Sequence, residues 1–435
     1  MRRRIAMLGG TTNLGDCIVA LRYLLNPRRL IDGPEIEKYE DAFAGKVGVR
    51  FACSFSSARV GIYGLLLALG IKPGDEVILQ VPTHIVVPNA IRFAGAKPVY
   101  VDCTLDTYNI DLEQIAKKIT PRSKVLLVQH TFGIPVDMDS ALYLARRFGL
   151  ILIEDCVHAL GSKYQGRMIG SFGKASVFST EETKTISTTM GGMVATNDEE
   201  LAAKMREFRS CCQSPQTGLT VRYLLKLIVY HFLTEPHMHL FARYLYDKIG
   251  NRHPLPRPVS GEESRGMRPV RYEQRLSNAQ AALGLRQLGR LESNLEHRRR
   301  IAEFYRSKLA DPFYNPPCHR RGAEPLYVRY PVWIENRNTQ AFFVSAPHAV
   351  LGTWFTSVLE ESVSPAVGNY EEGSCPRAEN VSKHLINLPT HPRVKMKDAE
   401  VIASEVMSMF GRGAGESEKS SKTVRNKSFG IRSAS

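Results

Sequence analysis

From about residue 48, short runs of apolar residues alternate with longer segments in which apolar residues recur every three or four positions. The short runs predict strands and the longer segments predict helices. The predicted strands are 77–81, 98–102, 124–129, 150–155, 175–179 and 193–197. The predicted helices lie between them, at 58–70, 87–94, 111–118, 138–148 and 198–209.

The predicted strands are apolar at consecutive positions rather than at alternate ones. Such strands are buried on both faces, which is typical of a mostly parallel sheet with helices on either side, and the sequence therefore predicts an α/β fold. Ligands of these sheets bind beyond the carboxyl ends of the strands. Polar side chains gather at those ends, namely Ser56, Ser57, Thr83, His84, Asp155, His158, Ser179 and Lys184.

The alternation stops between about residues 210 and 270. The apolar stretch VRYLLKLIVYHFL is followed by MHLFARYLYDKI and then by a loop rich in Pro and Arg. Its length is well below the roughly 20 residues that span a bilayer. One interpretation is a pair of helices packed on the body of the protein or on a second subunit. The other is a peripheral contact of residues 223–246 with a membrane surface, because apolar and basic residues are mixed there.

The remaining pattern divides the chain into four parts. Residues 277–309 predict one long amphipathic helix that connects the large domain to a smaller one. We expect an N-terminal segment at 1–47, a large ligand-binding domain at 48–290 and a small C-terminal α+β domain at 291–411. The last part, 412–435, has few apolar residues, which indicates a disordered tail.

Charge and cysteine content narrow the classes of partner. The formal net charge of +15 favours acidic ligands such as phosphorylated substrates or anionic lipid. The chain has no nucleic-acid-binding motif, so we expect no nucleic-acid partner. None of the eight cysteines forms a CxxC pair, which is typical of free thiols in a reducing compartment. We expect a cytoplasmic protein, with the inner membrane surface as an alternative site of attachment.

Lys184 is the most informative residue of the predicted site. It lies among small hydroxylated residues in VFSTEETKTISTTMGGMVATND, after one predicted strand and before another. Burial disfavours the charged amine, and a neutral amine can attack an aldehyde. Pyridoxal phosphate requires such a lysine, an acid beside the pyridine nitrogen, a flat group against the ring and donors for the phosphate. The strand-end residues include a candidate for each requirement.

Longer stretches of the chain show a resemblance to a known family. The matching text includes LIDGPEIEKYEDAFA, LGIKPGDEVI, AGAKPVYVDCTLDTYNID, IEDCVHALGSKYQG, GSFGKASVFS, GGMVATNDEELA, QAALGLRQL and LPTHP. In this order they resemble the DegT/DnrJ/EryC1/StrS family of sugar aminotransferases. The resemblance implies the type I fold of transferases that depend on pyridoxal 5′-phosphate (PLP), with a mostly parallel sheet in the large domain.

The resemblance also implies a role for each site residue. Lys184 matches the lysine that binds the cofactor aldehyde, and Asp155 matches the acid that keeps the pyridine nitrogen protonated. His158 stands where the family usually has glutamine, near the ring oxygen, and His84 stands where an aromatic residue stacks on the ring. The phosphate is expected at the start of the helix 58–70 and at the strand end before the lysine, where it would meet Ser56, Ser57, Ala58, Arg59 and Ser179.

Three local departures from the family pattern concern the surroundings of the cofactor. The usual Ser-Gly-Thr reads Ser57-Ala58-Arg59, and the Gly-rich turn after the lysine reads Thr188-Thr189-Met190-Gly191-Gly192. The family's Asn-Tyr-Arg, whose asparagine reaches a neighbouring subunit's cofactor, reads Glu273-Gln274-Arg275. An acid beside a phosphate would repel it, so we expect Glu273 to point elsewhere.

The resemblance implies transfer of an amino group from an amino acid, with glutamate as the expected donor, to a keto sugar carried on a nucleotide. A homodimer is expected, because sites of this fold form between two subunits. Two alternatives remain. Sugar dehydratases of the family have histidine in place of the lysine, and Lys184 argues against that class. A non-catalytic or membrane-associated regulator or scaffold is the other alternative, favoured by the altered loops and the apolar segment.

Overall fold

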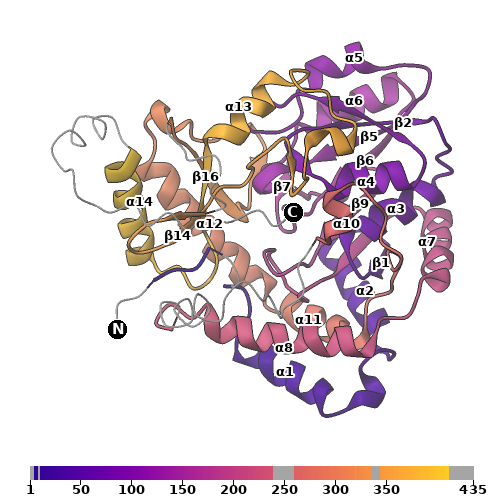
Figure 1. Ribbon diagram of the computed structural model, residues 1–435, viewed down its shortest axis with the longest axis horizontal. Coiled ribbons are helices and arrows are strands. Elements are labelled where there is room, and N and C mark those ends of the chain that lie inside the picture. Colours follow the sequence, from indigo (N-terminus) through magenta and orange to yellow (C-terminus); the bar gives the residue numbers. More distant parts are fainter. Residues whose placement is uncertain (1–3, 8–9, 239–258, 319, 336–342, 411–435) are drawn as a thin grey trace, which may run out of the picture.

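The computed structural model describes residues 4–7, 10–238, 259–318, 320–335 and 343–410 (Figure 1). A large α/β body surrounds a seven-stranded sheet, and a smaller part surrounds a four-stranded sheet. The predicted tail at 412–435 and the later part of 223–246 lie outside the described residues.

The large sheet has the strand order β1-β10-β9-β6-β5-β2-β4. Among these seven strands only β10 runs against the others, so the expected mostly parallel sheet is confirmed. All six predicted strands are present, to within one residue at each end, as β2 (Glu76–Gln80), β4 (Lys97–Val101), β5 (Ser123–Gln129), β6 (Ile151–Asp155), β9 (Ala175–Ser179) and β10 (Gly192–Thr196). Strand β1 (Phe51–Phe55) was not predicted, because FACSF has no β-branched residue; its pairing with β10 makes it a strand.

Side chains of the central strands enter two separate apolar cores, one on each face of the sheet. In β5, Val125 and Leu127 belong to one core and Leu126 and Val128 to the other. Successive side chains of a strand point to opposite faces, so a strand covered on both faces must be apolar at every position. This explains why the apolar runs in the sequence do not alternate.

Helices cover both faces of the large sheet. They are α2 (Glu35–Val47), α3 (Ala58–Ala68), α4 (Val86–Phe93), α5 (Ile115–Lys118), α6 (Met138–Arg147) and α7 (Glu199–Cys211). The helix predicted at 111–118 is a 3₁₀ turn (Leu112–Gln114) that continues into the short α5. Short strands β7 (Lys163–Tyr164), β8 (Arg167–Met168) and β11 (Ala323–Glu324) form a separate three-stranded sheet.

The prediction of one long helix over 277–309 is wrong. The segment forms α11 (Asn278–Leu288) and α12 (Leu291–Lys308), which are separated at Gly289 and Arg290. Glycine is a poor helix former, and Arg290 leaves the helical conformation with φ −118° and ψ 14°. The Arg290 guanidinium donates to the carbonyl oxygen of Thr11 at 3.0 Å and pairs with the buried carboxylate of Asp16. The residue at which the two helices separate is therefore bound to the N-terminal segment.

The smaller part contains an antiparallel sheet in the order β12-β16-β14-β13. Its strands are β12 (Arg329–Trp333), β13 (Phe343–Ser345), β14 (Val350–Gly352) and β16 (Leu385–Pro389). Helices α12, α13 (Pro376–His384) and α14 (Met396–Phe410) accompany this sheet on one side of the molecule (Figure 1). The four domain boundaries themselves stay a prediction.

One short strand joins the smaller part to the large body beside the predicted site. Strand β15 (Leu359–Glu360) pairs in parallel with β3 (Thr83–His84), so that Leu359 lies opposite Thr83 and Glu360 opposite His84. The segment around Glu360 is thereby fixed against the carboxyl end of the large sheet.

The apolar segment that interrupts the alternation forms α8 (Thr217–Leu233), which lies beside α1 (Leu14–Leu24) (Figure 1). Its inner side chains, among them Leu224 and Leu227, form a small core with Cys17, Ala20 and Leu283. The short helix α10 (Gly261–Ser264) follows at the end of the same region. Within the described ranges, no helix combines the length and the apolar character needed to cross a membrane.

Candidate active site

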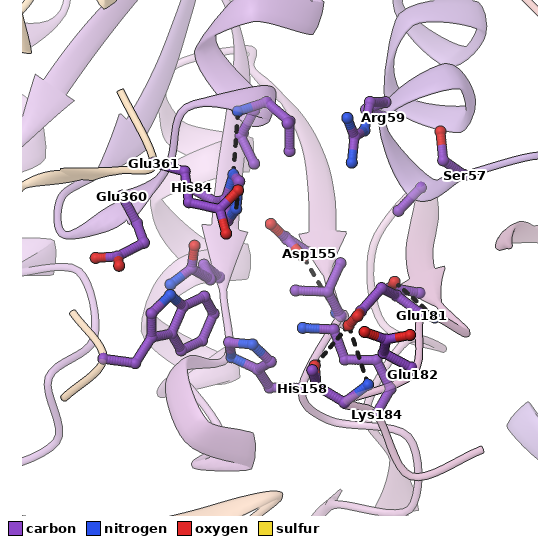
Figure 2. A pocket seen from close by; sticks show the side chains of 18 of the residues that line it. Ser57, Arg59, His84, Asp155, His158, Glu181, Glu182, Lys184, Glu360 and Glu361 are labelled. Carbon is purple, nitrogen blue, oxygen red and sulfur yellow. Dashed lines mark hydrogen bonds and ion pairs between the residues drawn. The ribbon is translucent and has the colours of Figure 1, made fainter. Parts of the chain in front are cut away.

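A cavity of about 230 Å³ lies at the carboxyl ends of the large sheet (Figure 2). Its walls come from the start of α3, from β3, from the ends of β6 and β9 and from the loop after β9. The smaller part contributes β12 and the segment 352–361. Eight of the nine predicted site residues line this cavity, namely Ser57, Ala58, Arg59, His84, Asp155, His158, Ser179 and Lys184.

Lys184 is only 8% exposed, and its side chain enters the cavity from the loop after β9. The loop is held by its backbone, since the Lys184 N–H donates to the carbonyl oxygen of Glu181 at 3.0 Å and its carbonyl accepts from the Thr11 hydroxyl at 3.1 Å. Burial lowers the pKa of the Lys184 amine to about 8, with a further lowering from the charge of Arg329. A substantial fraction of the amine is therefore neutral near pH 8 and able to act as a nucleophile.

Asp155 is the last residue of β6 and is almost completely buried. One of its carboxylate oxygens accepts a hydrogen bond from the backbone N–H of Val157 at 3.1 Å. Burial raises the pKa of Asp155 to about 6, while this hydrogen bond and the charge of Lys184 act in the opposite direction. Figure 2 shows Asp155 and Lys184 entering the same cavity, with the carboxylate toward its centre. A cationic group placed beside Asp155 would gain strongly from this buried carboxylate.

His158 is 2% exposed, and neither of its ring nitrogens has a hydrogen-bond partner among the described residues. Its ring packs against the indole of Trp354 with a centroid distance of 4.6 Å. Burial holds the pKa of His158 well below its usual range, so the ring is neutral. Buried polar groups without partners are rare, and one that lines a cavity indicates a place for a polar atom of a ligand.

His84 forms part of the opposite wall. Its Nδ1 accepts from the backbone N–H of Val86 at 3.4 Å, which fixes the ring plane. Burial, together with the charges of Arg59 and Lys184, lowers the pKa of His84 to about 3. The ring is therefore neutral, and its 3.7 Å approach to the carboxylate of Glu361 is not an ion pair. A neutral imidazole in this place offers a flat face to a ligand.

The start of α3 forms one end of the cavity, where the sequence predicts the phosphate. Ser57 is the N-cap of this 11-residue helix, and its side chain makes no capping hydrogen bond there. A Cβ atom on Gly192 would lie 2.2 Å from the backbone nitrogen of Ala58, so only glycine allows β10 to start this close to the helix. Free backbone N–H groups at a helix start favour an anion such as phosphate.

Two residues that were predicted to meet the phosphate, Ser56 and Arg59, have other contacts in the structure. Ser56 does not line this cavity, and its backbone N–H donates to the carbonyl oxygen of Gln274 at 3.0 Å, beside a neighbouring cavity of about 410 Å³. Arg59 lines both cavities, and its guanidinium pairs with the buried carboxylate of Glu263 on α10. Glu273 does not line either cavity and pairs with Arg268, as its expected outward orientation requires.

The family is decided by a match over nearly the whole chain. Residues 15–407 match the model of the DegT/DnrJ/EryC1/StrS aminotransferase family. The chain belongs to this family. Membership confirms the resemblance seen in the sequence and the predicted fold class, and it confirms PLP as the cofactor of the family.

Known members of the DegT/DnrJ/EryC1/StrS family show how far the similarity extends. GDP-perosamine synthase of Escherichia coli O157:H7 is 34% identical over 277 residues, which are 64% of this chain and 64% of that protein, just under two thirds of its length. The spore coat polysaccharide biosynthesis protein SpsC of Bacillus subtilis is 30% identical over 87% of this chain and 90% of that one. The structure of DesV from S. venezuelae, in complex with a ketimine intermediate, superimposes with a TM-score of 0.73 at 27% identity, covering 95% of this chain and all of DesV.

The residues present fit the cofactor of the DegT/DnrJ/EryC1/StrS family. The ring nitrogens of His158 have no partner among the described residues, and a ligand with a polar ring could provide one. The close approach of β10 to α3, which requires glycine at position 192, leaves the helix start available for the anionic end of such a ligand. Lys184 would hold the aldehyde of PLP, Asp155 its ring nitrogen, and the start of α3 its phosphate.

Sequence reasoning missed the residues that the smaller part contributes. Arg329, Trp354, Glu360 and Glu361 all line the cavity, although they follow Lys184 by more than 140 positions. A signal was present for one of them, since Arg329 is a lone charge in the apolar strand sequence YVRYPVW. A charged residue inside a buried strand is rare without a specific function.

Proposed function

We propose that this protein is a PLP-dependent aminotransferase that moves an amino group from an amino acid, with glutamate as the expected donor, to a keto sugar linked to a nucleotide. The observation that carries the proposal is the pairing of Lys184 and Asp155 in one buried cavity. Burial lowers the pKa of the Lys184 amine to about 8, as a nucleophilic amine requires, whereas the pKa of Asp155, raised by burial to about 6, still leaves its carboxylate mostly ionised at neutral pH.

PLP, when bound, supplies an aldehyde that takes up the amino group and a ring that accepts the electrons released at the α-carbon. The Lys184 amine would hold that aldehyde and, once displaced by the donor, would move a proton from the donor's α-carbon to the former aldehyde carbon, two bonds away. The Asp155 carboxylate would hold a proton on the ring nitrogen. His158 and His84 would orient the ring from two walls of the cavity.

The substrate class is supported by relatives and by charge. GDP-perosamine synthase is named for a nucleotide-linked amino sugar, and SpsC is named for polysaccharide biosynthesis. The net charge of +15 suits a substrate that carries a diphosphate. We accordingly place the reaction in the biosynthesis of a polysaccharide or glycoconjugate.

The proposal is tested by Lys184→Ala and Asp155→Asn. Incubation of the wild-type protein with PLP should produce the visible absorbance of the lysine-bound cofactor, and an amino donor should discharge it. We expect Lys184→Ala to abolish this absorbance and all transfer, and Asp155→Asn to keep the absorbance while lowering kcat about 100-fold or more. A wild-type protein that binds PLP but is never discharged by any amino acid would support the non-catalytic regulator instead.

We also propose a homodimer in the cytoplasm. The cavity of about 410 Å³ beside Ser57 and Arg59 is lined by Gln274 and Arg275, in the segment where the family reaches a neighbouring subunit. A sedimentation experiment that gives the mass of one chain would contradict this assembly.

A peripheral membrane contact is the last part of the proposal. The outer face of α8 exposes Leu225, Val229 and Phe232 to 45%, 40% and 44%. These residues are spaced at three and four positions, so they form one apolar stripe. Arg222 continues the stripe by one turn and is exposed, which would suit an anionic lipid surface.

A further inference from the structure

Arg329 is a buried cation for which the described residues provide no anionic partner. It is the first residue of β12, is 8% exposed and lines the cavity. Among the described residues its guanidinium forms no ion pair and no hydrogen bond, and its charged group lies 4.6 Å from the centre of the Trp354 indole. Burial lowers the pKa of Arg329 to about 10, so the side chain keeps its charge at neutral pH.

Two carboxylates attract the charge of Arg329 without forming an ion pair with it among the described residues. Glu181 and Glu360 both favour its charged form, but Glu360 accepts hydrogen bonds from the backbone and the hydroxyl of Thr356 at 2.5 Å and 3.0 Å. The second arginine nearby, Arg298, donates only to neutral oxygens of Asn294, Val328, Thr390 and Thr11. An unpaired charge in a buried place is costly, and such a cost is maintained where a ligand supplies the counter-charge.

Trp354 places this cation beside the reacting amine. The Nζ atom of Lys184 lies 5.3 Å from the centre of the same indole ring. His158, whose ring nitrogens have no described partner, packs against this ring as well. A small molecule that reaches the Lys184 amine along the indole face therefore meets the Arg329 guanidinium.

We propose that Arg329 binds the α-carboxylate of the amino donor, an inference that rests on the proposed function. A guanidinium presents two parallel N–H groups that match a carboxylate. The donor must bring its nitrogen to the position of the Lys184 amine, and the Trp354 ring that Lys184 and Arg329 share connects that position to the guanidinium. The carboxylates of Glu181, Glu360 and Glu361 line the same cavity and disfavour the more highly charged phosphate groups of the sugar substrate here.

The kinetic test compares Arg329→Gln with Arg329→Lys. We expect Arg329→Gln to raise the KM for the amino donor about 10- to 100-fold, the effect of losing a charge-assisted pair, and to change the KM for the nucleotide sugar less than about twofold. Arg329→Lys should recover part of the donor affinity, since lysine keeps the charge but lacks the two parallel N–H groups of a guanidinium. A larger change in the KM for the sugar would overturn the proposal and assign Arg329 to a phosphate. Arg320→Gln, at a 43% exposed side chain, is the matched control.

A binding test separates this inference from the proposed function. The chain has two tryptophans, so Trp333→Phe leaves the Trp354 fluorescence as a direct reporter. In that background we expect 2-oxoglutarate to change the emission with saturation, and its dimethyl ester to have no effect. Loss of the response in Arg329→Gln supports the inference even for a protein that performs no transfer. An equal response in the variant, or an equal response to the ester, would overturn it.

Thermal melting distinguishes a ligand-binding arginine from a structural one. Removal of an unpaired buried charge should leave the melting temperature of Arg329→Gln unchanged or raise it. A structural arginine would instead lower it, and such a fall, together with unchanged donor affinity, would refute the inference.

Discussion

Lys226 of α8 forms a buried ion pair with Glu182, with 2.6 Å between Nζ and a carboxylate oxygen. Glu182 lies two positions before Lys184 in the loop that enters the cavity. The side chains of this pair are 5% and 12% exposed, and burial raises the pKa of Glu182 to about 7 while Lys226 opposes that rise. The Thr189 hydroxyl also donates to the carbonyl oxygen of Tyr223 at 3.2 Å. The helix that interrupts the α/β pattern therefore holds the loop that carries Lys184.

Replacement of Lys226 by methionine tests this connection. The change leaves Glu182 buried without its cation, which destabilises a protein by about 3–5 kcal/mol where burial is complete. We expect a lower melting temperature and an approximately tenfold weaker affinity for PLP, measured by titration of the visible absorbance.

The matched control is Lys226→Met combined with Glu182→Gln. The double variant removes both charges, and we expect it to regain most of the stability and cofactor affinity. Equal losses in the single and double variants would show that α8 acts only through its apolar packing.

The pKa of Lys184 predicts the pH dependence of cofactor capture. Only the neutral amine attacks an aldehyde, and burial lowers the pKa of Lys184 to about 8. The rate of PLP capture by the cofactor-free protein should therefore rise with pH and level off above about pH 8. Asp155, with its pKa raised to about 6, is already half ionised at the start of this range and almost fully ionised near pH 8. Stopped-flow mixing between pH 6 and pH 10 measures the profile, and a midpoint near the ordinary lysine value would contradict the burial of the amine.

Gly192→Ala probes the phosphate end of the cavity. The added Cβ would lie 2.2 Å from the Ala58 nitrogen and must displace the start of α3 or β10. We expect the affinity for PLP to fall about tenfold or more, because the helix N–H groups lose their alignment with the phosphate.

Pyridoxal without the phosphate is the control ligand for this variant. Its affinity should change much less than that of PLP, since pyridoxal has no phosphate to lose its contacts at the start of α3. Equal losses for both ligands would place the phosphate elsewhere or indicate general unfolding, which circular dichroism detects.

The apolar stripe of α8 predicts binding to anionic vesicles. Glutamate at Leu225, Val229 and Phe232 would add repulsion and remove apolar contact, so we expect sedimentation with phosphatidylserine-containing vesicles to fall severalfold. Val363→Glu, at a residue 64% exposed, is the control for a change of charge alone. Unchanged sedimentation of the triple variant would refute the membrane contact and leave a protein partner for this stripe.

Much of the large domain, and the gathering of most predicted site residues around one cavity, could be predicted from the sequence. Residues of β5 such as Val125 and Leu126 must both be apolar, because the strand is covered on each face, and that demand is visible in any buried parallel strand. Lys184 and Asp155 were selected because Asp155 ends one apolar strand and Lys184 follows another within one run of α/β units. Local spacing and the shared carboxyl edge of a parallel sheet suffice to bring such residues together.

The tertiary structure alone decided the partners of these residues. Arg329 and Trp354 enter the cavity from the smaller part. Glu263 forms an ion pair with Arg59, and Lys226 forms one with Glu182. The sequence also did not predict that α11 ends at Leu288, because the ion pair of Arg290 with Asp16 is a tertiary contact. The periodicity of strands and helices depends on residues that are neighbours along the chain. A buried charge is instead paired with a distant group that packing brings within reach. The pattern of apolar and polar residues therefore does not reveal that partner.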